Sequence, residues 1–303
     1  MPITDTPLRY PGGKSQLTPV VIDILTRNGM LYGEYAEPFA GGAGIAMTLL
    51  LNNYVSGIYL NDIDPAIYAF WHSVLYLPDS LCDRIQQVEV NIEEWHRQRK
   101  VFLDPGCTDT LDKGFATLFL NRTNRSGILR GGVIGGLQQS GNYKIGCRFN
   151  KTDLIRKVRR IADYQDQITL TCMDAAKFLK KVLPKSSSNT LVNLDPPYFG
   201  KGPELYTNFY KAADHAMLAK AVSLLRRRWI VTYDDTPEIR QLYEAYPTYS
   251  SSLNYSAQVK RVGVELLVAD HQLKLHPSFA NMEITGPDCV FAEREATPHI
   301  PVR

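Results

Sequence analysis

The sequence predicts an α/β protein, in which an open mixed β-sheet carries helices on both faces and is interrupted by a mainly helical insertion. Three observations lead to this prediction. A strand, a glycine-rich turn and a helix follow one another in residues 35–51. Two strand-like apolar stretches end at acidic residues, Asp62 and Asp195. Roughly 100 residues separate Asp62 from the next expected strand, near Gln167, which is far more than a βα connection needs.

The composition fits a large intracellular domain. The chain has 303 residues and is 44% hydrophobic, which is enough for one large core or for a domain with an insertion. Its five cysteines form no Cys-x-x-Cys pair, which argues against a disulfide framework or a zinc site and suits a reducing cytoplasm. No apolar stretch of 18 residues and no signal-like start are present in the sequence, so neither a membrane span nor a secretory signal is expected.

The first strand–turn–helix unit has the pattern of a nucleoside-binding site. Glycines at 41, 42 and 44 would let the backbone approach a ligand at a helix N-terminus. Asp62 stands 20 residues beyond Gly42, where an acid accepts hydrogen bonds from ribose hydroxyls. Met47 occupies the place of the third small residue of a dinucleotide motif, which argues against an NAD-type oxidoreductase. A plain βα turn with a capping Asp is the competing interpretation of this unit alone.

The strand at 191–194 ends abruptly at Asp195, Pro196, Pro197 and Tyr198. Prolines lack a backbone donor and fix φ, so the strand has to stop there. In an open α/β sheet, ligands bind at the carboxyl ends of the strands. The turn therefore holds a carboxylate, a prolyl carbonyl and an aromatic ring over the expected crevice. Taken alone, an ordinary strand-terminating turn with a capping Asp explains it about equally well.

Residues 121–160 are strongly basic. They carry ten Lys or Arg and one acid, a net charge of +9 that leaves about −6 for the rest of the chain. The segment also holds seven glycines, among Asn and Gln side chains. A glycine-rich loop with Arg, Asn and Gln suits base edges, and the following helix at 151–164 suits phosphates. A solvated charged face is the alternative.

The remaining elements follow from periodicity and breakers. The Gly-Gly-Lys turn at 12–14 is a weak anion-binding signal, for which an ordinary surface turn is the commoner explanation. Phe115, Leu118 and Phe119 are expected to be core residues on one helix face. Helices are predicted at 16–26, over most of 66–121, at 175–183 and at 214–228. Strands are predicted at 167–172 and 229–233, and a hairpin is predicted from 249–256 and 262–269. Residues 271–303 are left unassigned.

Together, the motifs resemble those of the Dam-like DNA adenine-N6 methyltransferases. The matches are Tyr-Pro-Gly-Gly-Lys at 10–14, Glu-Pro-Phe-Ala-Gly-Gly at 37–42, Asn-Asp-Ile-Asp at 61–64, Leu-Asn-Arg at 120–122, Asp174, and Asp-Pro-Pro-Tyr at 195–198. They occur in the family's order and span most of residues 7–269. The resemblance implies a Rossmann-like methyltransferase fold, S-adenosyl-L-methionine (AdoMet) as the methyl donor and no metal. The acceptor would be N6 of a flipped-out adenine in double-stranded DNA.

The resemblance also implies roles for individual residues and for parts of the chain. The catalytic residues would be Asp195, Pro196, Pro197 and Tyr198, and Phe199 or Tyr206 would assist in stacking on the adenine. The cofactor site would consist of Tyr10, Lys14, Phe39, Gly41, Asp62, Asp174 and Asp195. DNA would be bound by Asn121, Arg122, Asn124, Arg125, Arg130, Lys144 and Arg148. The AdoMet domain would comprise 1–65 and 166–270, the target-recognition domain 66–165, and a tail 271–303.

Several alternatives stay open. Readers of GATC in this family carry an aromatic residue and a further Asn after Leu-Asn-Arg, whereas this chain has Thr-Asn-Arg-Ser-Gly at 123–127. The recognition sequence is therefore open, with Arg130 as the candidate guanine reader. The same fold acting on cytosine N4 or on RNA adenine, and a non-catalytic DNA-binding relative, are the other candidates. A monomer in the cytoplasm of a bacterial or phage-infected cell is expected.

Overall fold

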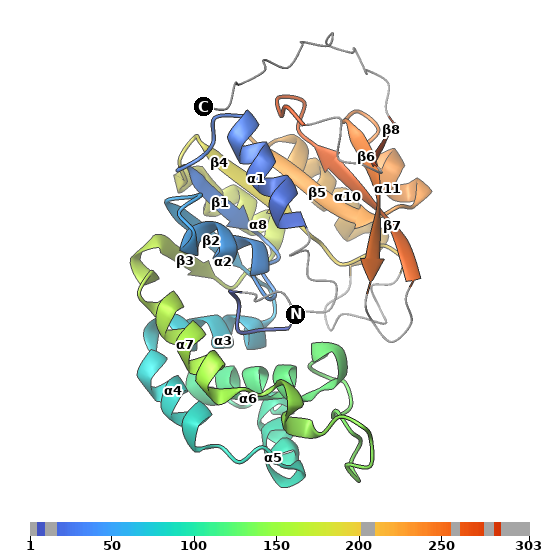
Figure 1. Cartoon of the computed structure of the whole chain (residues 1–303). Helices are drawn as coiled ribbons and strands as arrows, with labels where there is room; N and C mark the ends of the chain where they lie inside the picture. Colours follow the sequence, from blue (N-terminus) through green and yellow to red (C-terminus); the bar gives the residue numbers. More distant parts are fainter. Residues whose placement is uncertain (1–4, 10–16, 201–209, 256–260, 276–281, 286–303) are drawn as a thin grey trace, which may run out of the picture.

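The computed structural model describes residues 5–9, 17–200, 210–255, 261–275 and 282–285. These residues form one eight-stranded sheet with the strand order β3-β2-β1-β4-β5-β7-β6-β8 (Figure 1). Neighbouring strands from β3 to β5 are parallel, and β7, β6 and β8 continue the sheet in antiparallel pairing. The strands are β1 (Glu34–Glu37), β2 (Gly57–Asn61), β3 (Ile168–Thr171), β4 (Thr190–Leu194), β5 (Arg228–Asp234), β6 (Thr248–Tyr255), β7 (Arg261–Ala269) and β8 (Met282–Thr285).

Helices cover both faces of the sheet, as the sequence predicts. One core lies between the sheet and α1 and α2, and the other packs α8, α10 and α11 against the opposite face. Successive residues of a strand point to opposite faces, so Leu191 joins the first core and Val192 the second. The helices of these layers are α1 (Thr18–Arg27), α2 (Gly44–Leu51), α8 (Ala175–Lys181), α10 (Ala212–Ser223) and α11 (Pro237–Leu242).

Residues 65–162 form the helical insertion, which lies at one side of the sheet, below β2 and β3 in Figure 1. Short 3₁₀ turns at Arg125–Gly127 and Ile145–Arg148 interrupt the loop that joins its last two helices. Phe115, Leu118 and Phe119 are all buried, as predicted. The helices are α3 (Pro65–Tyr76), α4 (Pro78–Gln87), α5 (Ile92–Leu103), α6 (Thr110–Thr123) and α7 (Lys151–Ala162).

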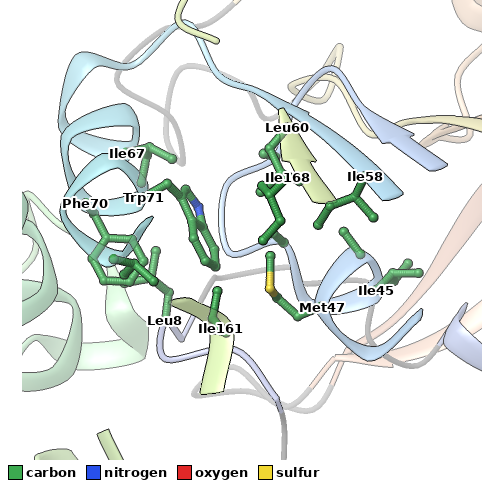
Figure 2. Close-up of a cluster of buried hydrophobic side chains, with 14 of the residues drawn as sticks. Leu8, Ile45, Met47, Ile58, Leu60, Ile67, Phe70, Trp71, Ile161 and Ile168 are labelled. Atoms are coloured by element: carbon green, nitrogen blue, oxygen red, sulfur yellow. The ribbon is translucent and has the colours of Figure 1, made fainter. Parts of the chain in front are cut away.

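The insertion shares its core with the sheet. Figure 2 shows Trp71 of α3 and Ile161 of α7 in one cluster with Leu60 of β2 and Ile168 of β3. Met47 of α2 lies in the same cluster and is fully buried. The residue that breaks the dinucleotide motif is therefore a core side chain. Because the insertion and this face of the sheet share one continuous core, the division of the chain at residues 66 and 165 stays a prediction.

Two sequence predictions about the elements need correction. Helix α10 ends at Ser223, five residues before the predicted end, because Arg228 already begins β5 and Arg227 donates to the Ser186 carbonyl at 2.7 Å. The region left unassigned beyond residue 270 contributes β8, which pairs with β6. The predicted hairpin of β6 and β7 is confirmed.

Candidate functional site

Acidic residues lie at or shortly after the carboxyl ends of the parallel strands on both sides of β1. Asp174 comes after β3, Asp62 after β2 and Asp195 after β4, and Asp234 is the last residue of β5. In the sheet order, β1 with its glycine loop lies between β2 and β4. The direction of strand succession reverses between β1 and β4, and this switch point is where open α/β sheets bind ligands. Asp195 and the glycine loop flank that point.

Asn61 holds three strand ends together at this edge. Its Nδ2 donates to the carbonyl oxygens of Pro38 at 3.0 Å and Met173 at 2.9 Å. Its Oδ1 accepts from Thr171 Oγ1 at 2.8 Å and from Met173 N at 3.2 Å. The side chain is fully buried, so a polar residue there is tolerated only because both ends of its amide are satisfied. The Asn of the Asn-Asp motif is therefore a structural residue.

The glycine loop is shaped for a close ligand approach and is tied to Asp62. Gly41 has φ +44° and Ala43 has φ +45°, a region that non-glycine residues seldom adopt. Gly41 N donates to Asp62 Oδ2 at 2.9 Å, and Trp71 Nε1 donates to Gly41 O at 2.9 Å. Asp62 Oδ1 also accepts from Asp64 N at 2.9 Å. Burial raises the pKa of Asp62 to about 6, so this carboxylate ionises close to neutral pH.

The other residues predicted for the cofactor site lie around this loop as far as the structure describes them. Phe39 is half-buried, and its ring meets that of Tyr210 edge-on with centroids 5.8 Å apart. Asp174 is exposed, and its Oδ1 caps α8 by accepting from Lys177 N at 3.1 Å. Tyr10 and Lys14 lie outside the described residues, as does Tyr206.

The Asp195 carboxylate is held from the neighbouring strand. Thr232 of β5 donates from Oγ1 to Asp195 Oδ1 at 2.9 Å, and Thr232 itself is buried. Pro196 and Tyr198 are buried, and Pro197 is half-buried. In the free protein the Asp-Pro-Pro-Tyr turn is thus partly buried, and it presents a carboxylate at the carboxyl end of β4.

Asp234 and His215 contact the residues that directly follow the turn, and the sequence interpretation missed both. Asp234 accepts from Phe199 N at 2.8 Å and from Gly200 N at 2.9 Å. The buried His215 ring lies 5.2 Å from the Phe199 ring, and its Nδ1 is 2.9 Å from Tyr233 Oη. Burial lowers the pKa of His215, which favours the neutral ring. The only signal in the sequence is that Asp234 directly follows the expected strand at 229–233; the pairing of that strand with the Asp195 strand is seen only in the structure.

A buried polar chain links the Asp195 strand to the glycine loop. Asn193 Nδ2 donates to Tyr35 Oη at 2.8 Å, and Tyr35 Oη donates to Glu37 Oε1 at 3.1 Å. The same Glu37 oxygen accepts from Ala46 N, at the beginning of α2, at 3.2 Å. Burial raises the pKa of Glu37 to about 8, so this side chain stays protonated at neutral pH. The chain of contacts fixes α2 and the loop relative to β4.

Two of the asparagines predicted to read DNA are structural. Asn121 is buried and donates to Gly127 O at 3.0 Å, besides bonding to the backbone of Arg9 in both directions. Asn124 is also buried: it accepts from Trp95 Nε1 at 2.7 Å and donates to the carbonyls of Ile128 and Leu129. Their amides are engaged inside the protein, which favours a structural role, and the prediction that Asn121 and Asn124 bind DNA stays a prediction.

The predicted cationic residues are more accessible. Arg125, Arg130 and Lys144 are exposed, and Arg148 is half-buried. Arg122 lies deeper, in the last turn of α6. Burial, reinforced by the nearby Arg9, lowers the pKa of Arg122 to about 10. The loop between α6 and α7 therefore presents positive charge. The amides of Asn121 and Asn124 bond to its backbone and stabilise its conformation.

Within the described residues, no group of three or more His, Cys, Asp or Glu side chains has the arrangement of a metal site. The same part of the chain contains no helix long and apolar enough to span a membrane.

The strand order and the switch point define a Rossmann-like α/β protein with a ligand site at the carboxyl ends of its parallel strands. Residues 10–258 match the sequence model of the D12 class N6 adenine-specific DNA methyltransferases, and the chain belongs to that family. It is therefore an enzyme that methylates N6 of adenine in DNA. A search of curated proteins gave no significant match.

Solved methyltransferase structures resemble the chain only weakly. The rRNA methyltransferase aviRa from Streptomyces viridochromogenes is 15% identical, with 84% of each chain covered and a TM-score of 0.36. TrmK from M. capricolum, solved with S-adenosyl-homocysteine, is 7% identical, with 82% of this chain and 67% of that chain covered and a TM-score of 0.35. The methyltransferase NGO1261 from Neisseria gonorrhoeae is 13% identical, with coverages of 88% and 73% and a TM-score of 0.36. The family assignment rests on the sequence match.

Proposed function

We propose that the enzyme transfers a methyl group from AdoMet to N6 of an adenine flipped out of double-stranded DNA, within a short recognition sequence, and that Asp195 is the central catalytic residue. The observation that carries this proposal is the Asp195 carboxylate, fixed by Thr232 at the end of β4 and adjacent in the sheet to the glycine loop of β1. A carboxylate at that point can accept hydrogen bonds from an amino group while the loop accommodates a nucleoside.

Adenine N6 is a poor nucleophile because its lone pair is delocalised into the ring, and in a duplex it is also stacked inside. Enzymes that modify a base therefore flip it out, at a cost of a few kcal/mol. In the proposal, Tyr198 stacks on the flipped adenine with help from Phe199. Asp195 and the Pro196 carbonyl each accept a hydrogen bond from the amino group, which draws the nitrogen toward tetrahedral geometry. The site works by positioning and by electrostatic complementarity to the charge that develops on N6.

The residues of the edge fit AdoMet as the bound methyl donor. AdoMet supplies an electrophilic methyl group on a sulfonium. The carboxylates of Asp62, Asp174 and Asp195 give the edge a negative potential that suits this cation. Asp62, whose carboxylate accepts from Gly41 N and Asp64 N, would accept from ribose hydroxyls. Phe39 would form an apolar wall, Asp174 would accept from the adenine amino group of the donor, and Tyr10 and Lys14 would complete the site.

Recognition of DNA is proposed for the basic loop of the insertion. Its exposed side chains, Arg125, Arg130 and Lys144, are the candidates for contacts with base edges and phosphates. Asn121 and Asn124 then act indirectly, by shaping the loop. The enzyme would act as a monomer, because one chain carries both the cofactor site and the reading element. The DNA substrate implies work in the cytoplasm of a bacterial or phage-infected cell.

The test is transfer of label from methyl-labelled AdoMet to plasmid DNA, followed by nucleoside analysis and long-read mapping. N6-methyladenine in one short sequence context is the expected product. N4-methylcytosine, or labelling of RNA but not DNA, would replace the proposed acceptor. Methylation of nearly every adenine would keep the chemistry but remove site specificity. No transfer despite AdoMet binding would leave only the non-catalytic DNA-binding relative.

A further inference from the structure

Strand β5 anchors both ends of the segment that follows β4. Thr232 and Asp234 are two residues apart in β5, so their side chains point to the same face of the sheet. Thr232 Oγ1 donates to Asp195 Oδ1 at 2.9 Å, at the beginning of the segment. Asp234 accepts from Phe199 N at 2.8 Å and from Gly200 N at 2.9 Å, at its end. One strand therefore fixes both the carboxylate and the backbone that follows the Asp-Pro-Pro-Tyr motif.

The two hydrogen bonds to Asp234 use both oxygens of its carboxylate. Phe199 N donates to Oδ1, and Gly200 N donates to Oδ2. A Cβ on Gly200 would stand 3.2 Å from the same Oδ2, which is closer than side chains normally pack. These amides lie outside the strand ladder, where a backbone donor needs another acceptor, and a carboxylate is a strong one. Asp234 is thus matched to two successive N–H groups, which an amide side chain with one acceptor oxygen would not satisfy.

The ring of Phe199 is held as well as its backbone. It is half-buried, and the ring of the fully buried His215 lies 5.2 Å away. His215 also contacts Tyr210, with ring centroids 5.4 Å apart, and Tyr210 meets Phe39 at 5.8 Å. Contacts between ring edges and faces of this kind are favourable. A row of four rings therefore runs from the glycine loop, where AdoMet is proposed to bind, to the residue after the Asp-Pro-Pro-Tyr motif.

We propose that Asp234 is a positioning residue for methyl transfer. By holding two successive amides, it fixes the main chain directly after Tyr198 and thereby the ring that stacks on the flipped adenine. The inference rests on the proposed function, in which Tyr198 forms that stack, and adds a residue to it. Asp234 acts through the placement of the turn and touches neither the base nor AdoMet. A displaced ring would leave N6 of the bound adenine out of line with the methyl group, and such a displacement costs rate more than affinity.

Asp234→Asn tests the proposal, because it replaces one of the two acceptor oxygens by a donor and keeps the size of the side chain. The single-turnover rate of methyl transfer at saturating DNA and AdoMet should fall about tenfold, as expected for the loss of one hydrogen bond. The Kd values for DNA and AdoMet should stay near those of the wild type. Asp235→Asn is the matched control, because the neighbouring carboxylate is paired with Arg240 at 2.6 and 2.7 Å; it should keep the wild-type rate.

Stacking of the base is measured with 2-aminopurine in place of the target adenine, in the complex of enzyme, duplex and S-adenosyl-homocysteine. Stacking on an aromatic ring quenches the fluorescence of this base and stabilises its flipped position. The wild-type complex should therefore be partly quenched, and Tyr198→Ala should be brighter. Asp234→Asn should shift the emission in the same direction as Tyr198→Ala, whereas Asp235→Asn should keep the wild-type emission.

The outcomes separate this role from a purely structural one. A wild-type rate and wild-type emission in Asp234→Asn would overturn the positioning role, while the defect of Tyr198→Ala left the proposed function standing. A loss of DNA and AdoMet affinity as large as the loss of rate would indicate a general structural defect and overturn it as well. If Tyr198→Ala itself kept the wild-type rate and emission, the stacking in the proposed function would fail, and the role of Asp234 with it.

Discussion

The carboxyl edge of the parallel strands and the basic loop of the insertion use polar side chains in opposite ways. At the edge, Asp195 accepts a hydrogen bond from Thr232 of the neighbouring strand, and Asp62 accepts one from Gly41 of the glycine loop. At the basic loop, the amides of Asn121 and Asn124 bond to backbone carbonyl groups, whereas Arg125, Arg130 and Lys144 are exposed. A motif at a strand end can therefore be interpreted as chemistry, whereas a polar motif in an irregular loop can equally be scaffolding.

The difference has a physical origin. A strand end leaves its next residue at the sheet edge whatever the surrounding sequence, so the position of Asp195 follows from the strand alone. An irregular loop has no regular partners for its backbone groups, and buried carbonyls have to be satisfied by side chains. The asparagines of the loop meet that need. The following predictions test whether the two regions divide the work between chemistry and DNA binding.

The largest effect is expected for Asp195→Ala. Loss of the acceptor for the N6 amino group should lower the single-turnover rate of methyl transfer by about 10³-fold, with AdoMet affinity changed only a few-fold. Rapid-quench measurement with labelled AdoMet gives the rate, and Asp166→Ala, at an exposed acid before β3, is the control. A variant with a near wild-type rate would exclude Asp195 from the chemistry.

A smaller effect is expected at the ribose end of the edge. The raised pKa of Asp62, about 6, means that the carboxylate is ionised above that pH and protonated below it. An ionised carboxylate is the better acceptor for hydroxyl donors, so AdoMet affinity should fall as the pH falls through 6. Asp62→Asn should weaken AdoMet binding by about tenfold at pH 8 and flatten this dependence. Calorimetric titrations at several pH values check both; equal pH profiles would remove Asp62 from the cofactor site.

Removal of the hydroxyl that orients the catalytic carboxylate should cost less. Thr232→Val keeps the shape of the side chain but deletes its hydrogen bond to Asp195, so kcat should fall about tenfold, the equivalent of ~1.4 kcal/mol, while KM for DNA stays unchanged. Thr232→Ser retains the hydroxyl and should restore most of the rate. If the valine variant raised KM and left kcat intact, Thr232 would not act through Asp195.

The smallest effect is expected in the basic loop. Arg125→Gln and Arg130→Gln should each weaken DNA binding modestly and, where the arginine contacts phosphate, reduce the slope of log K against log salt by about 1. A base-reading arginine should instead relax sequence preference at one position. Fluorescence anisotropy over a range of salt concentrations distinguishes the two. Unchanged slopes and unchanged sequence preference in both variants would move the DNA surface elsewhere.

Much of the catalytic half was predictable from the sequence. The strand ends at Asp62 and Asp195 and the ~100-residue gap between the expected strands give the order of the elements and the place of the insertion. Met47, which breaks the dinucleotide motif, is a buried core residue. Thr232 and Asp234 could not be found in this way, since their roles depend on β5 being the sheet neighbour of β4.

The insertion was less predictable, for a reason that its contacts explain. Its net charge pointed to DNA, but the sequence gives no sign that Asn121 bonds to Arg9, 112 positions away. Long-range contacts of this kind decide whether a polar side chain faces the solvent or the backbone.

The most direct test of the division of work is a parallel measurement on Asp195→Asn and Arg130→Gln, with the Kd for DNA and the single-turnover methyl-transfer rate at saturating DNA and AdoMet determined for each. The account predicts that the first variant loses rate and keeps DNA affinity, while the second loses affinity or sequence discrimination and keeps rate. If both variants lost rate and affinity together, chemistry and DNA binding would not be separable between these two regions, and the account would be contradicted.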